Sequence, residues 1–127
     1  MDENKFKMRP RKFALDIIRL VEDLPKSKST DVIGRQIIRS ATSVGANYRS
    51  ACRAQSPADM IAKLKLVEEE ADESIYWLEL LVEADTIPAE RSADLSKEAN
   101  ELLAMTVASI KTLRKKSASL NLKTTNR

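Results

Sequence analysis

The sequence has no histidine and one cysteine, Cys52, among its 127 residues. Zinc sites and nucleophile–base pairs that depend on histidine or on several cysteines therefore cannot be built, and an internal disulfide is excluded. A metal site made of carboxylates alone remains possible. Cys52 lies on the apolar side of its predicted helix, which favours a buried thiol. We expect a protein that is not an enzyme and that needs no cofactor or metal.

Glycine, proline and aromatic residues are also scarce, with two glycines, four prolines and 4% aromatic residues. Few turns are available, and the core must be aliphatic. A hydrophobic content of 43% is enough for one folded domain, and this composition favours a few long helices over many strands. No uninterrupted apolar run approaches the ~18 residues of a membrane span, and the charged N-terminus lacks a signal region. We therefore expect a cytoplasmic protein.

Prolines at positions 10, 25, 57 and 88 divide the chain into four amphipathic segments. Apolar residues at helical spacing predict helices over 10–24 and 31–55. They also predict a third helix that begins at Pro57, with Ser56 as its cap, and a fourth that ends near Lys116.

Short connections between such helices predict an all-α, antiparallel up-down-up-down four-helix bundle. The expected organisation is a basic N-terminal arm over 1–9, the bundle over 10–117 and a flexible basic tail over 118–127. The stretch "SATSVGAN" in the second helix contains weak helix formers. We interpret it as a place where a neighbouring helix approaches closely.

Four arginines frame this stretch and lie on the face of the second helix opposite its apolar stripe. They extend over about 27 Å at a rise of about 1.5 Å per residue. Such a row can grip phosphates through the planar guanidinium fork, or it can form salt bridges with the acidic third helix. Both interpretations are open for these residues: Arg35, Arg39, Arg49 and Arg53.

In the predicted topology, basic residues gather at one pole of the bundle, although the net charge is only +3. This polarity is typical of proteins that bind nucleic acid or another anionic surface. Because aromatic residues are few, contact with phosphates is favoured over stacking on bases. The candidate nucleic-acid-binding residues are Arg9, Arg11, Lys12, Arg49, Arg53, Lys111, Arg114, Lys115 and Lys116.

The third helix is apolar on more than one side. Leu66, Trp77 and Leu80 lie away from its main apolar stripe, among acidic residues. Trp77 could complete a wide core or anchor a contact between subunits. We predict self-association with these three residues at or near the interface.

The run "RQIIRSATSVGANYRSACRAQSPADMIAKLKLVEEEADESIYWLELL" resembles the bacterial 23S rRNA intervening-sequence proteins, a family of four-helix bundles. The resemblance rests on the pair Arg39-Ser40, the small segment ending in Ala46-Asn47 and the later "EEADESIYWLELL". It covers roughly 13–115. The same run of sequence is also similar to accessory variability determinants of diversity-generating retroelements. The resemblance implies an antiparallel bundle, ring-forming and often pentameric members, no known catalysis, and RNA and reverse-transcriptase binding in the retroelement relatives.

Two functions therefore remain open from the sequence. The first is a homo-oligomeric accessory protein, possibly a pentamer, that binds RNA or DNA through its basic surface. The second is a protein–protein interaction scaffold without nucleic-acid binding. Arginines free at the surface favour the first, and arginines paired with carboxylates favour the second.

Overall fold

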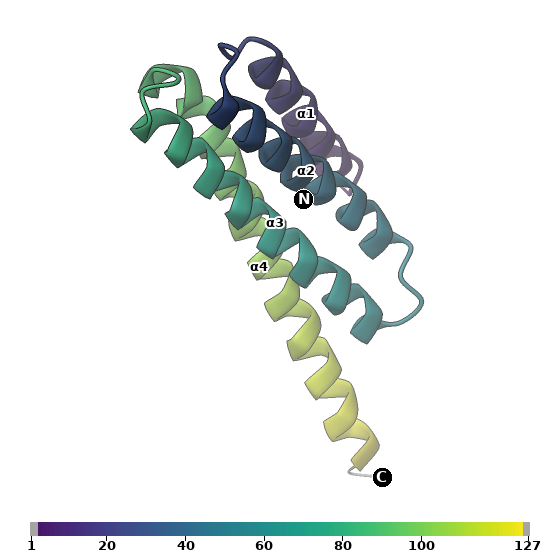
Figure 1. Cartoon of the computed structure of the whole chain (residues 1–127). Helices are drawn as coiled ribbons and strands as arrows, with labels where there is room; N and C mark the ends of the chain where they lie inside the picture. The colour runs from purple at the N-terminus through teal and green to yellow at the C-terminus, as the bar shows by residue number, and fades with distance from the viewer. Residues whose placement is uncertain (1–2, 126–127) are drawn as a thin grey trace.

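The chain was examined as a computed structural model, which describes the backbone of residues 3–125 and the side chains of residues 7–120. The outermost parts of the predicted arm and tail lie outside these ranges. The described backbone is all-α and holds no strand. Its four helices (Figure 1) are α1 (Glu3–Glu22), α2 (Lys28–Cys52), α3 (Pro57–Glu83) and α4 (Ala89–Thr125).

Serine caps fix where α2 and α3 begin. Ser27 Oγ accepts the backbone N–H of Thr30, and Thr30 Oγ1 accepts the N–H of Ser27, so two otherwise unpaired donors are satisfied. Ser56 caps α3 in the same way through the N–H of Asp59, with Pro57 in the first turn. The predicted start of the third helix is confirmed, and α2 begins three residues before its predicted start because Ser27 caps it.

The outer ends of α1 and α4 extend further than the sequence suggested. Pro10 was expected to open the first helix, but it lies inside α1 and is fully buried. A proline inside a helix removes one backbone hydrogen bond, because it has no N–H. Here the turn that precedes Pro10 is helical as well, so α1 extends on both sides of it. The last helix was expected to end near Lys116, whereas α4 continues to Thr125 because no glycine or proline interrupts it.

Hydrophobic side chains from all four helices fill the core, and all but Phe13 of its buried members are aliphatic, as the scarcity of aromatic residues predicted. Phe13, Ile17 and Leu20 of α1 recur at helical spacing and are almost fully buried. Burial of each such side chain stabilises the fold by roughly 1.5–3 kcal/mol relative to exposure. The partners on the other helices include Ile37, Ala41, Val44, Val67, Ala71, Leu78, Leu81, Ala99 and Leu102.

The small residues of α2 lie where neighbouring helices contact it. Ser40 is buried and faces Ser74 of α3. Toward α1, a Cβ atom added to Gly34 would meet Val21 Cγ1 at 3.0 Å, which is tighter than an ordinary contact, so the packing favours glycine there. A Cβ atom added to Gly45 would lie 3.8 Å from Pro10, which is an ordinary contact. Close approach therefore explains Gly34 but not Gly45.

Each helix contacts its neighbours in chain order, and α1 also contacts α4. The α1–α2 and α3–α4 connections lie at one end of the molecule and the α2–α3 connection at the other (Figure 1). The C-terminal part of α4 projects well beyond the other three helices.

Candidate nucleic-acid interface

Two of the predicted binding residues on α1 form ion pairs with carboxylates. Arg9 forms a two-pronged contact with Glu98 of α4, through Nε at 3.0 Å and Nη2 at 2.5 Å, and a further bond to Glu101 at 2.8 Å. The hydrogen bond to Glu98 is the largest influence that raises the pKa of Arg9. Lys12 Nζ lies 2.6 Å from Asp16 on the next turn. Arg9 therefore joins α1 to α4.

The N-terminal half of the arginine row on α2 is also paired. Arg35 contacts Asp31 one turn before it. Arg39 reaches α3, where it pairs with Glu70 at 3.1 Å and with Glu73. Partial burial lowers the pKa of Arg39, but the hydrogen bond to Glu73 and the charge of Glu70 outweigh that effect and raise it. For these two arginines the salt-bridge interpretation holds.

The C-terminal half of the row differs. Arg49 and Arg53 are exposed on the last turns of α2, and neither has a carboxylate partner among the described residues. Arg11 of α1 is likewise exposed without such a partner. All three line one groove between α1 and α2, with a volume of about 710 Å³. Three guanidinium groups therefore converge on one hollow with their charges uncompensated.

Small side chains form much of this groove. Ala14, Gly45 and Ala46 line the groove, and so does Cys52. Cys52 is half-buried, so the thiol is less enclosed than its position on the helix suggested. Met8 also lines the groove and is 64% exposed. The groove thus combines positive charge with a shallow, uncharged surface.

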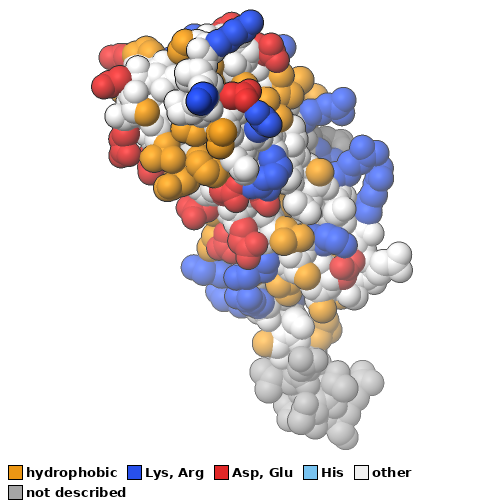
Figure 2. Space-filling model, in the orientation of Figure 1, with side chains coloured by type: hydrophobic (Ala, Val, Ile, Leu, Met, Phe, Trp, Pro, Cys, Tyr) orange, Lys and Arg blue, Asp and Glu red, His pale blue; other side chains and the backbone are white. Residues whose placement is uncertain are grey.

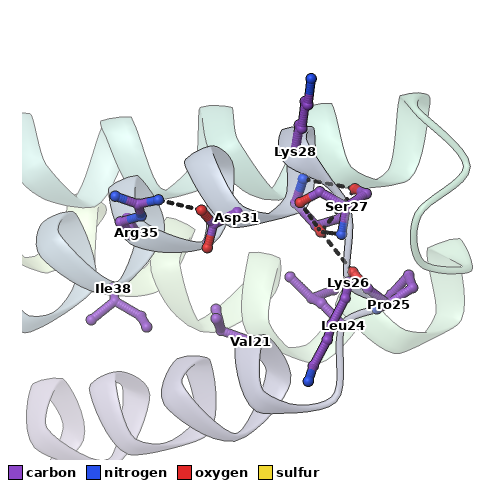
Figure 3. A pocket seen from close by; sticks show the side chains of 11 residues that line it. Val21, Leu24, Pro25, Lys26, Ser27, Lys28, Asp31, Arg35 and Ile38 are labelled. Atoms are coloured by element: carbon purple, nitrogen blue, oxygen red, sulfur yellow. Dashed lines mark hydrogen bonds and ion pairs between the residues drawn. The ribbon is translucent and has the colours of Figure 1, made fainter.

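A second hollow lies between α1 and α2 at the opposite end of the pair, with a volume of about 620 Å³ (Figure 3). Val21 and Ile38 face it from the two helices. Arg35 turns toward Asp31 in this view, and the side chain of Lys28 points away from the hollow. The first turn of α2 is already capped by Ser27. Lys26 and Lys28 also line this hollow, but its one arginine is paired, unlike Arg49 and Arg53 of the groove.

The predicted basic residues of α4 do not line the groove. Lys and Arg side chains gather beside the lower part of α4 on the face shown in Figure 2. The predicted residues here line neither hollow between α1 and α2, and no ion pair joins them to a described carboxylate. All four are exposed: Lys111, Arg114, Lys115 and Lys116. They are additional exposed cations outside the lining of the groove.

The predicted interface residues on α3 differ in exposure. Leu66 is 42% exposed, whereas Trp77 and Leu80 are half-buried. Trp77 packs partly against the core and donates its indole N–H to Glu73 at 3.0 Å. Trp77 thus completes part of the core, and its role in a contact between subunits stays a prediction. Hydrophobic side chains also form a patch on the upper part of the face shown in Figure 2.

Tyr76 was not among the predicted interface residues. It is 52% exposed, and its ring meets that of Trp77 edge to face with centroids 5.0 Å apart. Its exposure could have been predicted from the sequence. Tyr76 lies two residues before the buried Leu78, and two residues correspond to about 200° around a helix, so the two side chains lie on opposite faces.

Within the described residues, no group of three or more cysteine or acidic side chains is placed to hold a metal ion. The described helices also include none that is both long and apolar enough to cross a membrane.

Comparison with known proteins identifies the family. The 23S rRNA-intervening sequence protein family matches residues 2–108, and the chain belongs to this family. A solved structure from Bacteroides thetaiotaomicron, described as a protein of unknown function from the S23 ribosomal protein family, is similar with 38% identity and a TM-score of 0.79. The match covers 84% of this chain and 98% of that one. None of the curated proteins matches.

Proposed function

We propose that this chain is a non-enzymatic nucleic-acid-binding protein that holds RNA phosphates at the groove between α1 and α2. The observation that carries the proposal is the unequal pairing of the arginines. Five arginines on other surfaces contact carboxylates, and these are Arg9, Arg19, Arg35, Arg39 and Arg91. The three that line the groove contact no carboxylate in the part of the chain whose side chains are described.

Arginine suits phosphate because its planar fork donates two parallel hydrogen bonds to the phosphate oxygens. A carboxylate partner would compete with that contact, so free guanidinium groups are the better ligands. The exposed cations of α4, Lys111 to Lys116, provide a second surface for a longer nucleic acid. The family name refers to an intervening sequence of 23S rRNA, which makes RNA the first ligand to test.

The oligomeric part of the proposal rests on α3. We propose that the molecule is an up-down-up-down antiparallel bundle and that Leu66, Tyr76, Trp77 and Leu80 meet a second copy. Exposed Tyr76 and Leu66 supply apolar area that the core does not bury. The same observation favours a second candidate function, a scaffold that binds another protein through this surface.

The experiment is a binding titration of an RNA hairpin at low ionic strength with the parent protein and two triple variants. Arg11→Gln, Arg49→Gln and Arg53→Gln together remove the groove charges. Arg19→Gln, Arg35→Gln and Arg91→Gln together remove the same net charge elsewhere. We expect the first variant alone to weaken binding, by roughly 1.5–3 kcal/mol for each charged hydrogen bond lost. Equal weakening in both variants would show that only net charge matters.

A further inference from the structure

Gly45 lines the groove, and the packing of the neighbouring helix does not require a glycine at this position. A Cβ atom at this position would keep 3.8 Å from the nearest atoms, all in Pro10. Glycine inside a helix is destabilising relative to alanine, chiefly because it loses more conformational freedom on folding. A helical glycine that neighbouring helices do not require is typical of a place where a ligand approaches the backbone closely. Gly34 provides the contrast, since Val21 leaves it no space.

The groove is also larger than a phosphate contact needs. Its volume of about 710 Å³ lies within the roughly 300–1,000 Å³ of pockets that enclose whole small molecules. Ala14 of α1 and Ala46 of α2 line the groove together with Gly45 and add uncharged surface to it. Exposed Met8 stands at the same groove, and a thioether makes favourable contacts with aromatic rings. These features suit a flat, uncharged group bound next to an anion.

A nucleotide joins these two parts in one ligand. Its phosphate matches the guanidinium groups of Arg11, Arg49 and Arg53, and its base matches the small-residue surface. In an RNA duplex the bases are stacked inside and only phosphates, riboses and groove edges are accessible, whereas unpaired bases can be turned out toward a protein. Arginine can serve both parts, because it grips phosphate and also stacks on base planes.

We propose that the groove binds one unpaired nucleotide of RNA, with its base on the surface formed by Ala14, Gly45 and Ala46. This inference rests on the proposed function and makes it more specific. It predicts that the protein prefers single-stranded segments, loops or ends of RNA. The cations of α4 then contact phosphates of single-stranded and duplex RNA alike.

Cys52 provides a direct report on the groove, because it is the only cysteine of the chain and lines the same hollow. The experiment measures the rate at which N-ethylmaleimide alkylates Cys52 in the parent protein. The probes are hexauridylate, a blunt RNA duplex at the same phosphate concentration, and inorganic phosphate. At a hexauridylate concentration about ten times its dissociation constant, we expect alkylation to slow by about tenfold, because about one groove in ten is then free. Duplex and phosphate should slow it far less.

Two substitutions test the base surface without changing charge. Ala46→Leu adds bulk at an exposed position of the groove, and Ala62→Leu adds the same bulk at an exposed position of α3 as the control. The first should weaken hexauridylate binding about tenfold and leave duplex binding unchanged, because only the contact with the base is lost. Gly45→Ala should raise the melting temperature and still weaken hexauridylate binding, which a purely structural glycine would not do.

The outcomes separate the two proposals. Binding of duplex and hexauridylate with equal affinity and without protection of Cys52 would overturn the nucleotide groove and leave the phosphate-binding surface standing. Absence of salt-sensitive binding to either RNA would overturn both. Weaker hexauridylate binding in Ala62→Leu as well as in Ala46→Leu would also count against the groove.

Discussion

Ser40 Oγ and Ser74 Oγ lie 2.8 Å apart across the buried contact between α2 and α3. Each hydroxyl also contacts a carbonyl of its own helix, Ile37 O at 3.2 Å and Glu70 O at 2.9 Å. Two polar side chains thus satisfy each other inside the core, and their small size allows the helices to approach closely. This pair gives the weak helix formers of α2 a structural role.

Enlarging Ser40 should therefore destabilise the bundle. Ser40→Leu forces a larger side chain against α3 and removes the contact with the Ser74 hydroxyl, so we expect a loss of about 1–3 kcal/mol in the free energy of unfolding. Urea denaturation measures it. Ser50→Leu, at an exposed position of the same helix, is the control and should change stability little. Equal effects of the two substitutions would contradict the close contact.

The end of α3 predicts a stabilising substitution. Asp85 has a φ of 57°, and the N–H groups of Asp85 and Thr86 bond to the carbonyls of Val82 and Leu81. This is the pattern in which glycine is favoured at the left-handed position. Asp85→Gly should raise the free energy of unfolding by up to about 1 kcal/mol, since a side chain is disfavoured at such a φ. A lower melting temperature would argue against this account of the helix end.

The cap of α3 predicts a dependence on pH. Asp59 accepts a hydrogen bond from the Gln55 backbone at 3.2 Å and pairs with Lys63 at 3.2 Å, and these contacts lower its pKa. A pKa lower in the folded than in the unfolded state means that the ionised carboxylate stabilises the fold above about pH 4. That stabilisation disappears as the pH falls through the folded value.

Melting temperatures between pH 7 and pH 2 test this dependence. The difference between the parent and Asp59→Asn should be present at pH 7 and vanish at the acid end. Asp94→Asn, at an exposed carboxylate of α4, is the control. A difference that stays constant across the range would exclude a titrating contribution from Asp59.

The α3 surface predicts a change in molecular mass. Leu66→Glu combined with Leu80→Glu places charges in the proposed contact between copies, so sedimentation velocity should show an oligomer for the parent and a monomer for the variant. Leu15→Glu introduces one negative charge at an exposed leucine of α1 and should leave the oligomer intact. A parent that sediments as a monomer at micromolar concentration would end this proposal.

The helices could be predicted from the sequence because their signals are local. Ser56 and Pro57 marked the start of α3, and apolar spacing identified the buried face of α1. The outer helix ends could not be placed in the same way. Pro10 is a start signal in many helices, but here its buried packing against α2 lets the helix continue through it.

The site was less predictable, because pairing depends on distant residues. Arg9 and Arg11 look alike in the sequence, yet Arg9 meets Glu98, which is 89 positions away, and Arg11 meets no described carboxylate. Arg39 likewise depends on distant partners, because Glu70 and Glu73 of α3 lie 31 and 34 positions away. Sequence reasoning could name the arginines, but only the packing of the helices decides which charges stay free.

The most direct test of nucleic-acid binding at the groove is the salt dependence of RNA affinity. Binding of hexauridylate is measured from low to moderate salt for the parent and for the triple glutamine variants of Arg11, Arg49 and Arg53 and of Arg19, Arg35 and Arg91. Each lost contact with single-stranded RNA should lower the slope of log affinity against log salt by about 0.7, so the groove variant should lose about 2. The control variant should keep the parent slope. Equal slopes for all three proteins, or a parent without salt-dependent binding, would contradict the proposal.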